Sequence, residues 1–317
     1  MKNVLEQSST LSFPFLFTIF LFCCSACHSS KSAVSNTKIQ NTFDWQGHRG
    51  ARGLAPENTL PAFLKALEFQ SIRTLELDLA VSADYQVLIS HEPWMSAAIC
   101  STPAGTVVKA EDESKLLLYQ LPYAEIAQYD CGRRGNERFP EQQAMAAHKP
   151  LLKEVVQAVQ NYCAKNKRSL PRYNIEIKSQ PDWDGKRTPP PAEFVKLVLH
   201  EIQNLGINNS CCIQSFDPRV LREVRAIAPK MTLALLVENR RGMEANVQEL
   251  GFTPNIYSPY FALLSAEVVQ KAHTMGMQVI PWTVNETNAM QKMIEMGVDG
   301  IITDYPNRIP GEVKSEK

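Results

Sequence analysis

Apolar residues follow two different spacings along most of the chain. From residue 43 onward, short runs rich in β-branched and aromatic residues alternate with longer runs that have helical periodicity. The short runs predict strands at 44–48, 73–79, 85–91, 173–178, 211–216, 231–237, 255–259, 277–284 and 299–303. The longer runs predict helices at 58–70, 150–166, 191–205, 217–228, 240–250, 265–275 and 286–296. Strands that alternate with helices in this way predict a parallel sheet.

One of the strand candidates does not fit a parallel arrangement. Only Ala80 to Asp84 separate 73–79 from 85–91, whereas a parallel crossover needs roughly a dozen residues or more. We therefore expect 85–91 to fold back as a hairpin strand, in a register centred near Ala83 and Asp84 that puts His91 opposite Glu76. The other eight strands and their helices predict an α/β fold, a (β/α)₈ TIM-type barrel.

An insertion at 92–149, after the second strand region, interrupts the alternation. A loop of this length in a compact domain is usually functional or a small subdomain. Because it leaves the barrel directly after a strand end, we expect it to cap the site. A second irregular stretch, 180–191, contains four prolines and follows the strand at 173–178.

Composition supports one large domain, the barrel at 43–317. The chain has 317 residues, of which 44% are apolar and 21% charged, and this suits one barrel-sized core. Acidic and basic residues balance at 33 each, so no net charge attracts nucleic acid. No protein partner is evident, and no later segment is long and apolar enough to span a membrane.

The N-terminus predicts export. Residues 11–24 are nearly all apolar, too short for a spanning helix and typical of a signal peptide. Ser25, Ala26 and Cys27 follow and resemble the lipobox of bacterial lipoproteins. We expect a lipoprotein signal peptide at 1–26, a lipid anchor at Cys27 and a flexible polar tether at 27–42. Cys24 is a second candidate for the anchor and an ordinary cleaved signal is the alternative; the protein would be periplasmic or at the cell surface of a bacterium.

Five cysteines remain in the body if Cys27 is the anchor. Cys100 and Cys131 share the insertion and are candidates for a disulfide, which export would permit. Cys211 and Cys212 lie in a strand and are expected to be buried thiols. The odd number leaves at least one cysteine unpaired, and the spacing contains no CxxC zinc pattern.

Three carboxylates at strand ends predict a metal site. Glu76 and Asp78 are two residues apart on one strand, and Glu176 lies on another, all between apolar residues that face the opposite way. In a closed barrel they point to the interior, where carboxylates are costly unless they are paired or bind a metal. Oxygen ligands favour one hard divalent cation, Ca²⁺ or Mg²⁺. The alternative is ion pairing with Arg49 and Lys178.

Two of the six histidines are candidates for catalysis. His48 ends the first strand between glycines, and His91 ends the hairpin strand, so both would lie beside the carboxylates. Imidazole is suited to general acid–base work because its pKa falls near neutral pH. The remaining histidines, His28, His148, His200 and His273, are expected to have surface or packing roles.

The order of the motifs identifies a family. The chain carries, in order, His48-Arg49-Gly50, Pro56-Glu57-Asn58-Thr59, Glu76-Leu77-Asp78, His91, Glu176-Ile177-Lys178, Gln214-Ser215-Phe216, Trp282-Thr283-Val284-Asn285 and Gly300-Ile301-Ile302-Thr303-Asp304. This series resembles that of the glycerophosphodiester phosphodiesterases and covers about residues 44 to 309.

The resemblance implies metal-dependent hydrolysis of a small glycerophosphodiester to glycerol 3-phosphate and an alcohol. His48 and His91 would be the acid–base pair, and the three carboxylates would hold one divalent cation. Substrate-binding roles are implied for Arg49 and Lys178 with the phosphate, Glu57 near the metal and substrate, and Trp282 beside the glycerol. A cyclic intermediate and direct attack by water both remain open. A helix N-terminal charge for Glu57 and a core aromatic for Trp282 are the alternatives.

The sequence departs from the family pattern beside His91. The usual His-Asp pair is His91-Glu92 here, followed by Pro93-Trp94, so the carboxylate is expected to support the histidine in a changed orientation. This stretch borders the substrate side of the site, so the sequence does not determine which alcohol is the leaving group. A lysophospholipase D or a phospholipase C-type enzyme is the alternative enzyme, and a non-enzymatic lipoprotein that binds phosphodiesters is the other alternative.

Overall fold

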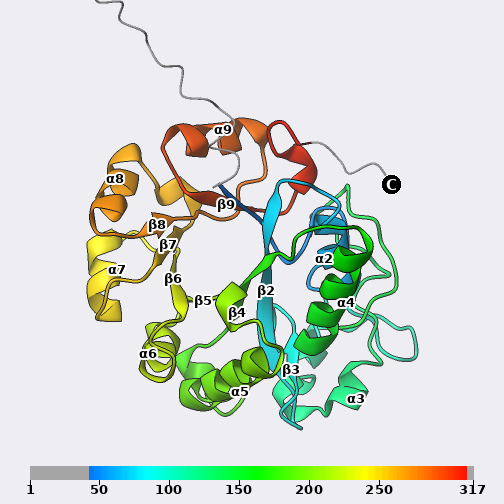
Figure 1. The fold of residues 1–317 in the computed structure, drawn as a ribbon. Helices are drawn as coiled ribbons and strands as arrows, with labels where there is room; N and C mark the ends of the chain where they lie inside the picture. Colours follow the sequence, from blue (N-terminus) through cyan, green and yellow to red (C-terminus); the bar gives the residue numbers. More distant parts are fainter. Residues whose placement is uncertain (1–42, 313–317) are drawn as a thin grey trace, which may run out of the picture.

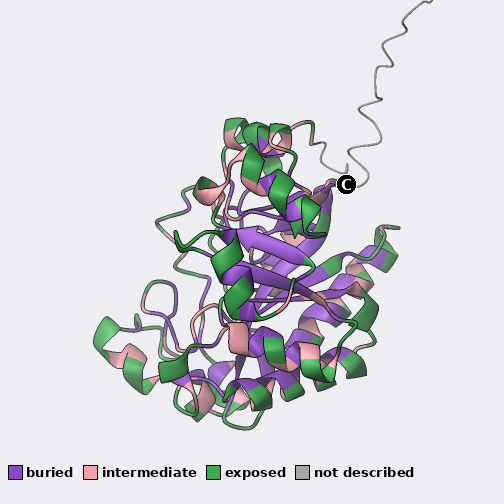
Figure 2. Cartoon of the chain, turned by 90° about the vertical axis from the view of Figure 1, so that its left-hand side faces the viewer, coloured by how far each residue is buried: buried purple, intermediate pink, exposed green. Residues whose placement is uncertain are grey.

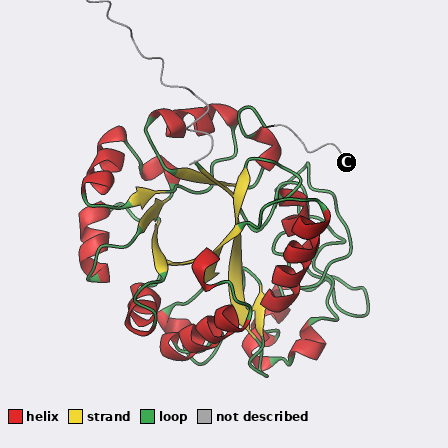
Figure 3. Cartoon of the chain, viewed as in Figure 1, coloured by secondary structure: helices red, strands yellow, loops and turns green. Residues whose placement is uncertain are grey.

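The computed structural model describes residues 43–312 and shows a parallel barrel surrounded by helices (Figures 1 and 3). The strands pair in the order β8-β7-β6-β5-β4-β2-β1-β9, with β3 paired to β2 outside this path. The predicted α/β class and (β/α)₈ architecture are therefore confirmed. The signal peptide, both candidate anchor cysteines and the tether lie outside the described residues.

Most strands and helices agree with the predicted ranges, except that β3 and β8 are shorter and α3 within the insertion was not predicted. The strands are β1 (Asp44–Gly47), β2 (Ile72–Val81), β3 (Val87–Ile89), β4 (Arg172–Ile177), β5 (Cys211–Ser215), β6 (Thr232–Val237), β7 (Ile256–Pro259), β8 (Gln278–Val279) and β9 (Gly300–Thr303). The α-helices are α2 (Leu60–Ala66), α3 (Tyr123–Ile126), α4 (Leu152–Lys165), α5 (Pro191–Asn204), α6 (Pro218–Ile227), α7 (Met243–Leu250), α8 (Ala266–Thr274) and α9 (Thr287–Glu295). As the sequence indicates, Asp217 caps α6, with Pro218 at its first position.

The strand predicted at 277–284 is regular only over β8. Pro281 has no N–H to donate, which interrupts a regular ladder. The segment still joins the barrel to its last strand, because the Asp299 and Ile302 N–H groups donate to the carbonyls of Val279 and Pro281. The barrel is thus nearly closed.

The hairpin strand β3 runs antiparallel to β2, as predicted, but its register differs by one residue. Leu79 pairs with Ile89 and Val81 with Val87, which centres the turn on Asp84 and would put His91 opposite Leu77. The predicted pairing of His91 with Glu76 is therefore wrong. His91 lies in the bend beyond the end of β3, so strand alternation does not determine where its side chain points.

The insertion forms a small subdomain with a core of its own beside the β2–β3 hairpin. Met95, Ile99, Leu118 and Ile126 of the insertion are buried together, and Figure 1 shows α3 and its loops next to β3 and outside the ring. A disulfide joins Cys100 to Cys131 across this subdomain. The predicted pair therefore forms, and it fixes the insertion internally.

Burial follows the two-sided pattern of a barrel. Figure 2 shows buried strands at the centre and exposed residues on the outer faces of the helices. Cys163 and Cys211 are buried free thiols, whereas the free thiol Cys212 is only partly buried. The prediction of a buried thiol is therefore confirmed for Cys211 and only partly confirmed for Cys212. Among the described residues, no helix is long and apolar enough to cross a membrane.

Candidate active site

The turn after β1 brings main-chain and side-chain groups into the barrel mouth. Arg49 has φ 49° and Gly50 has φ 85°, both in the left-handed region. A Cβ on Gly50 would lie 2.5 Å from the carbonyl carbon of Ala62, so only glycine fits there. This tight turn directs the Arg49 N–H to Oε2 of Glu76 at 2.8 Å.

Three carboxylates meet at the ends of β2 and β4. Glu76, Asp78 and Glu176 are buried, and each has a carboxylate oxygen that lies within 4.8 Å of a carboxylate oxygen of the other two. They come together because the register aligns Asp78 with Glu176 on the neighbouring strand. Gln214 donates to Oε1 of Glu76 at 2.8 Å, and Asn58 donates to Oδ2 of Asp78 at 2.7 Å. These amides fix the carboxylates in their orientations.

Burial and mutual repulsion perturb all three carboxyl groups. Burial, followed by the charge of Asp78, raises the pKa of Glu76 well above its ordinary value. Burial also raises the pKa of Glu176 to about 7, with Lys178 opposing the change. Burial acts to raise the pKa of Asp78 as well, but Arg49, His91 and Lys178 outweigh it and hold that pKa well below normal. Burial and repulsion between the carboxylates disfavour their charged forms, and a bound cation would favour those forms.

Two cationic side chains adjoin the carboxylate cluster. Lys178 lies 3.1 Å from Glu176 and 3.7 Å from Asp78, and Arg49 Nε lies 3.3 Å from Asp78. Arg49 Nε has no hydrogen-bond partner although it is buried. The ion pairs proposed as the alternative to a metal therefore exist.

The charges nevertheless favour a cation. With Glu57, Glu92 and Asp304 included, the site has six carboxylates against four cationic side chains, Arg49, Arg52, Lys149 and Lys178. Acidic groups therefore outnumber basic groups by two. One divalent ion would balance this excess. The oxygen donor set fits Ca²⁺ or Mg²⁺.

His48 is held by a carboxylate from the last strand. Its Nδ1 lies 2.6 Å from Oδ1 of Asp304, while its Nε2 lies 4.0 Å from Oε2 of Glu76. Asn285 holds Asp304 with a 2.8 Å side-chain bond. Burial lowers the pKa of His48 below its ordinary value despite the opposing charge of Asp304. A His oriented through Nδ1 leaves Nε2 available for proton transfer.

His91 has its own carboxylate, supplied by the next residue. Its Nδ1 lies 2.6 Å from Oε1 of Glu92, so the departure from the family pattern retains a supporting carboxylate. Burial, followed by Arg49, lowers the pKa of His91. The buried Lys149 supports this bend from the end of the insertion, because it donates to Ser90 Oγ at 2.7 Å and Ser90 donates to the Glu92 carbonyl at 2.6 Å.

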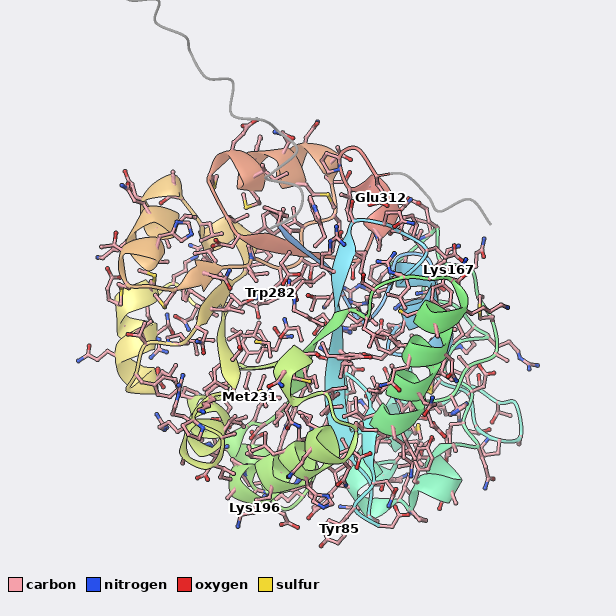
Figure 4. The ribbon with its side chains drawn as sticks, viewed as in Figure 1. Tyr85, Lys167, Lys196, Met231, Trp282 and Glu312 are labelled. Atoms are coloured by element: carbon pink, nitrogen blue, oxygen red, sulfur yellow. A yellow bond between two sulfur atoms is a disulfide. The ribbon has the colours of Figure 1, made fainter. Side chains whose placement is uncertain are left out.

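The other predicted site residues occupy different positions around the cluster. Glu57 lies behind Arg49, with Oε1 bonded to Arg49 and Oε2 to Arg52, and is therefore placed to orient Arg49. Trp282 lines a cavity of about 260 Å³ beside the cluster and donates its indole N–H to the Ser258 carbonyl at 2.9 Å. Figure 4 shows Trp282 within the ring of strands, whereas Lys196 lies on the outer side.

The sequence analysis assigned no role to several residues of the site. Asp304, Gln214 and Asn58 lie within the family motifs, and this position in a motif could have indicated a role at the site. Lys149 lies next to Pro150 at the end of the insertion, where nothing local indicates burial. His148, His200 and His273 instead contact Glu154, Asn204 and Asp299 away from the cluster.

The cluster opens into two adjoining cavities. The smaller, about 260 Å³, is lined by both histidines, Arg49, Arg52 and Gln214. From the insertion it receives Glu92 and Arg138, so the insertion borders this cavity at two residues. The larger cavity, about 770 Å³, begins at the same cluster.

The barrel, with carboxylates, histidines and cationic groups at its strand ends, defines an enzyme of the phosphodiester hydrolase class. The chain belongs to the glycerophosphoryl diester phosphodiesterase family, whose sequence profile matches residues 48–308. It is therefore a glycerophosphodiester phosphodiesterase, as the motif series indicated.

Individual relatives agree with this assignment. A glycerophosphodiester phosphodiesterase of Caldanaerobacter subterraneus is 28% identical over 83% of this chain and 94% of its own length. A solved structure from Silicibacter pomeroyi, assigned to the glycerophosphoryl diester phosphodiesterases, is 30% identical, covers 84% of this chain and 91% of its own, and has a TM-score of 0.74. An Oleispira antarctica phosphodiesterase in complex with the product sn-glycerol-3-phosphate shares the fold, at 20% identity and a TM-score of 0.66, over 86% of this chain and 97% of its own.

Proposed function

We propose that the enzyme hydrolyses glycerophosphodiesters to glycerol 3-phosphate and an alcohol, using one divalent cation, Ca²⁺ or Mg²⁺, and the pair His48 and His91. The observation that carries this proposal is the meeting of three buried carboxylates within 4.8 Å. Two histidines, each fixed by a carboxylate, adjoin them. The product bound to the Oleispira antarctica relative supports the choice of product.

Glu76, Asp78 and Glu176 would hold the cation, which would neutralise phosphoryl oxygens as negative charge develops. Arg49 and Lys178 line the smaller cavity and add positive charge for the phosphate. Trp282 gives this cavity an apolar side, which suits the carbon face of the glycerol.

The histidines transfer the protons in this proposal. One takes a proton from the nucleophile, and the other gives a proton to the oxygen of the departing alcohol as its bond to phosphorus breaks. The nucleophile is water, or it is the glycerol hydroxyl group, in which case a cyclic phosphate forms and water opens it in a second step. Asp304 and Glu92 stabilise whichever imidazole is protonated. Both carboxyl groups are ionised at neutral pH, because interactions with the histidines outweigh burial and hold both pKa values at about 2.

Product analysis tests the reaction. Purified enzyme is incubated with glycerophosphocholine, glycerophosphoethanolamine and lysophosphatidylcholine, with excess Mg²⁺ or Ca²⁺ and with a chelator. We expect glycerol 3-phosphate from the first two substrates, its loss with the chelator and its recovery with the cation.

Two results would contradict this proposal. Cleavage of the lysolipid alone would favour a lysophospholipase D, the activity of a human relative that is 24% identical over 83% of this chain and 83% of its own length. No cation-dependent cleavage of any glycerophosphodiester would favour a non-enzymatic binding protein.

We also propose that the protein is exported and lipid-anchored at Cys27, with 1–26 as the signal, 27–42 as the tether and 43–317 as the enzyme domain. The Cys100–Cys131 disulfide supports an oxidising compartment outside the cytoplasm. In bacteria expressing the full chain, Cys27→Ala is expected to abolish incorporation of labelled fatty acid, whereas Cys24→Ala retains it. Labelling that persists in Cys27→Ala would place the anchor elsewhere.

A further inference from the structure

A groove of about 770 Å³ extends from the carboxylate cluster across the ends of β4, β5 and β6. Its near end shares His91, Glu176, Lys178, Phe216 and Trp282 with the smaller cavity. The rest of its lining includes Asp217, Arg219, Arg222, Glu238 and Glu249. Nothing in the reaction proposed above uses this second space.

The two histidines differ in their relation to this groove. His91 lines both cavities, whereas His48 lines the smaller one. A phosphodiester bound at the shared residues would place one substituent in each space. A group in the groove would have its bridging oxygen on the side of His91, which is the position of a departing alcohol that needs a proton.

We propose that this groove binds the alcohol half of the substrate and selects a neutral polyol of about the size of inositol. The inference rests on the proposed hydrolysis of glycerophosphodiesters. It adds the identity of the leaving group and assigns His91 as the group that protonates it.

The size of the groove supports a large alcohol. It has about three times the volume of the smaller cavity, at about 770 Å³ against about 260 Å³. An ethanolamine would leave most of it filled with water, and only groups that contact the walls contribute to discrimination. A six-carbon ring with hydroxyl groups fills more of this space than ethanolamine does and presents more groups to the walls.

The charges in the groove do not select a cationic alcohol such as choline. Arg219 is engaged by Asp184 and Asp217, at 2.7 Å in each case, and the Glu249 carboxylate is engaged by Arg241. That leaves Arg222 and Glu238, which form no ion pair among the described residues and have opposite charges. A balanced wall offers hydrogen bonds to a neutral ligand without a net field for a charged one.

The polar far wall also does not suit an acyl chain. Arg222 is exposed and donates to the Glu249 carbonyl at 2.9 Å, which leaves further N–H groups of its guanidinium free. Glu238 is also exposed, lines the same groove and provides acceptors. A hydrocarbon chain along these groups would desolvate them without compensation, whereas hydroxyl groups both accept from Arg222 and donate to Glu238.

The near end supplies an apolar surface for the carbon face of the ring. Phe216 is 40% exposed and packs edge-to-face on Trp282, with centroids 5.4 Å apart. The exposed part of the Phe216 ring is therefore open to contact with a ligand that lies in the groove. An apolar face followed by paired donors and acceptors matches a cyclic polyol.

The test compares three glycerophosphodiesters, glycerophosphoinositol, glycerophosphoethanolamine and glycerophosphocholine, as substrates of the wild-type enzyme in saturating cation, and measures lysophosphatidylinositol beside them. We expect kcat/KM for glycerophosphoinositol to exceed that for either amine substrate by about tenfold or more. Arg222→Met and Glu238→Gln should each reduce this ratio by about tenfold, which is the expected effect of one lost charged hydrogen bond. Lys196→Met, a matched change on the exposed outer side of the barrel, should leave the ratio unchanged (Figure 4).

Each other outcome contradicts a different statement. Activity on all three substrates with no preference for the polyol, or a preference unaffected by Arg222→Met and Glu238→Gln, would overturn this inference and leave the proposed function intact. A preference for lysophosphatidylinositol over glycerophosphoinositol would overturn it in favour of an acyl chain. Cation-dependent activity on none of the substrates would overturn the proposed function and this inference together.

Discussion

Asp78→Asn is expected to lower turnover by about 10³-fold or more. Asp78 is 1% exposed and is contacted by Asn58, Arg49 and Lys178. Asparagine keeps the shape of the side chain but removes the charge that would bind the cation and balance Arg49 and Lys178. Loss of a preorganised electrostatic group typically costs about 10²–10³-fold, and loss of the cation adds to this. Steady-state kinetics on a glycerophosphodiester measures the effect.

A loss of metal binding must be separated from a loss of folding. Asp78→Asn leaves Arg49 and Lys178 without a buried charged partner, so the metal-free variant should be less stable than the metal-free wild type, and it should also lose the rise in Tm that the cation gives the wild type. Asp112→Asn is the matched control, since Asp112 is partly exposed on the insertion and forms a surface pair with Lys115. Wild-type turnover or an unchanged metal-induced Tm shift in Asp78→Asn would exclude Asp78 as a ligand.

His48→Ala and His91→Ala are each expected to lower turnover by about 10²-fold or more, the range for general acid–base groups. The two should differ on a substrate with an acidic leaving group, such as the p-nitrophenyl ester of glycerol phosphate. A nitrophenolate leaves without a proton, so His91→Ala should recover most of its activity on this substrate and His48→Ala should not.

His200→Ala is the control for both histidine variants, because His200 lies exposed on α5 and bonds Asn204. A near-wild-type rate in His48→Ala or His91→Ala would remove that residue from the mechanism. Recovery of His48→Ala instead of His91→Ala would reverse the assignment of the acid.

Local sequence patterns predicted most of the barrel because each strand and helix has its own periodicity. The largest error, at 277–284, arose because an apolar run with strand character contains Pro281, which cannot continue the ladder. The register of the β2–β3 hairpin was wrong by one residue, because it depends on the turn at Ser82–Gln86 and not on the pattern of the strands.

The site was predictable where strand alternation determines direction. Glu76, Asp78 and Glu176 lie on neighbouring strands whose alternating apolar residues point outward, so their convergence follows from the barrel. The supporting contacts of Asp304 and Lys149 join positions far apart in the chain, and local spacing contains no information about such contacts. At Glu92 the sequence did predict that the longer carboxylate still supports His91, and the structure shows this contact at 2.6 Å.

The most direct test of the account is a crystal structure with Mn²⁺ and sn-glycerol 3-phosphate, because manganese substitutes for Mg²⁺ and is located by its anomalous signal. The account predicts one strong peak within about 2.0–2.6 Å of oxygens from Glu76, Asp78 and Glu176, with the phosphate between it and the two histidines. An ion bound away from these carboxylates, or a phosphate bound with the three carboxylates free of metal, would contradict it.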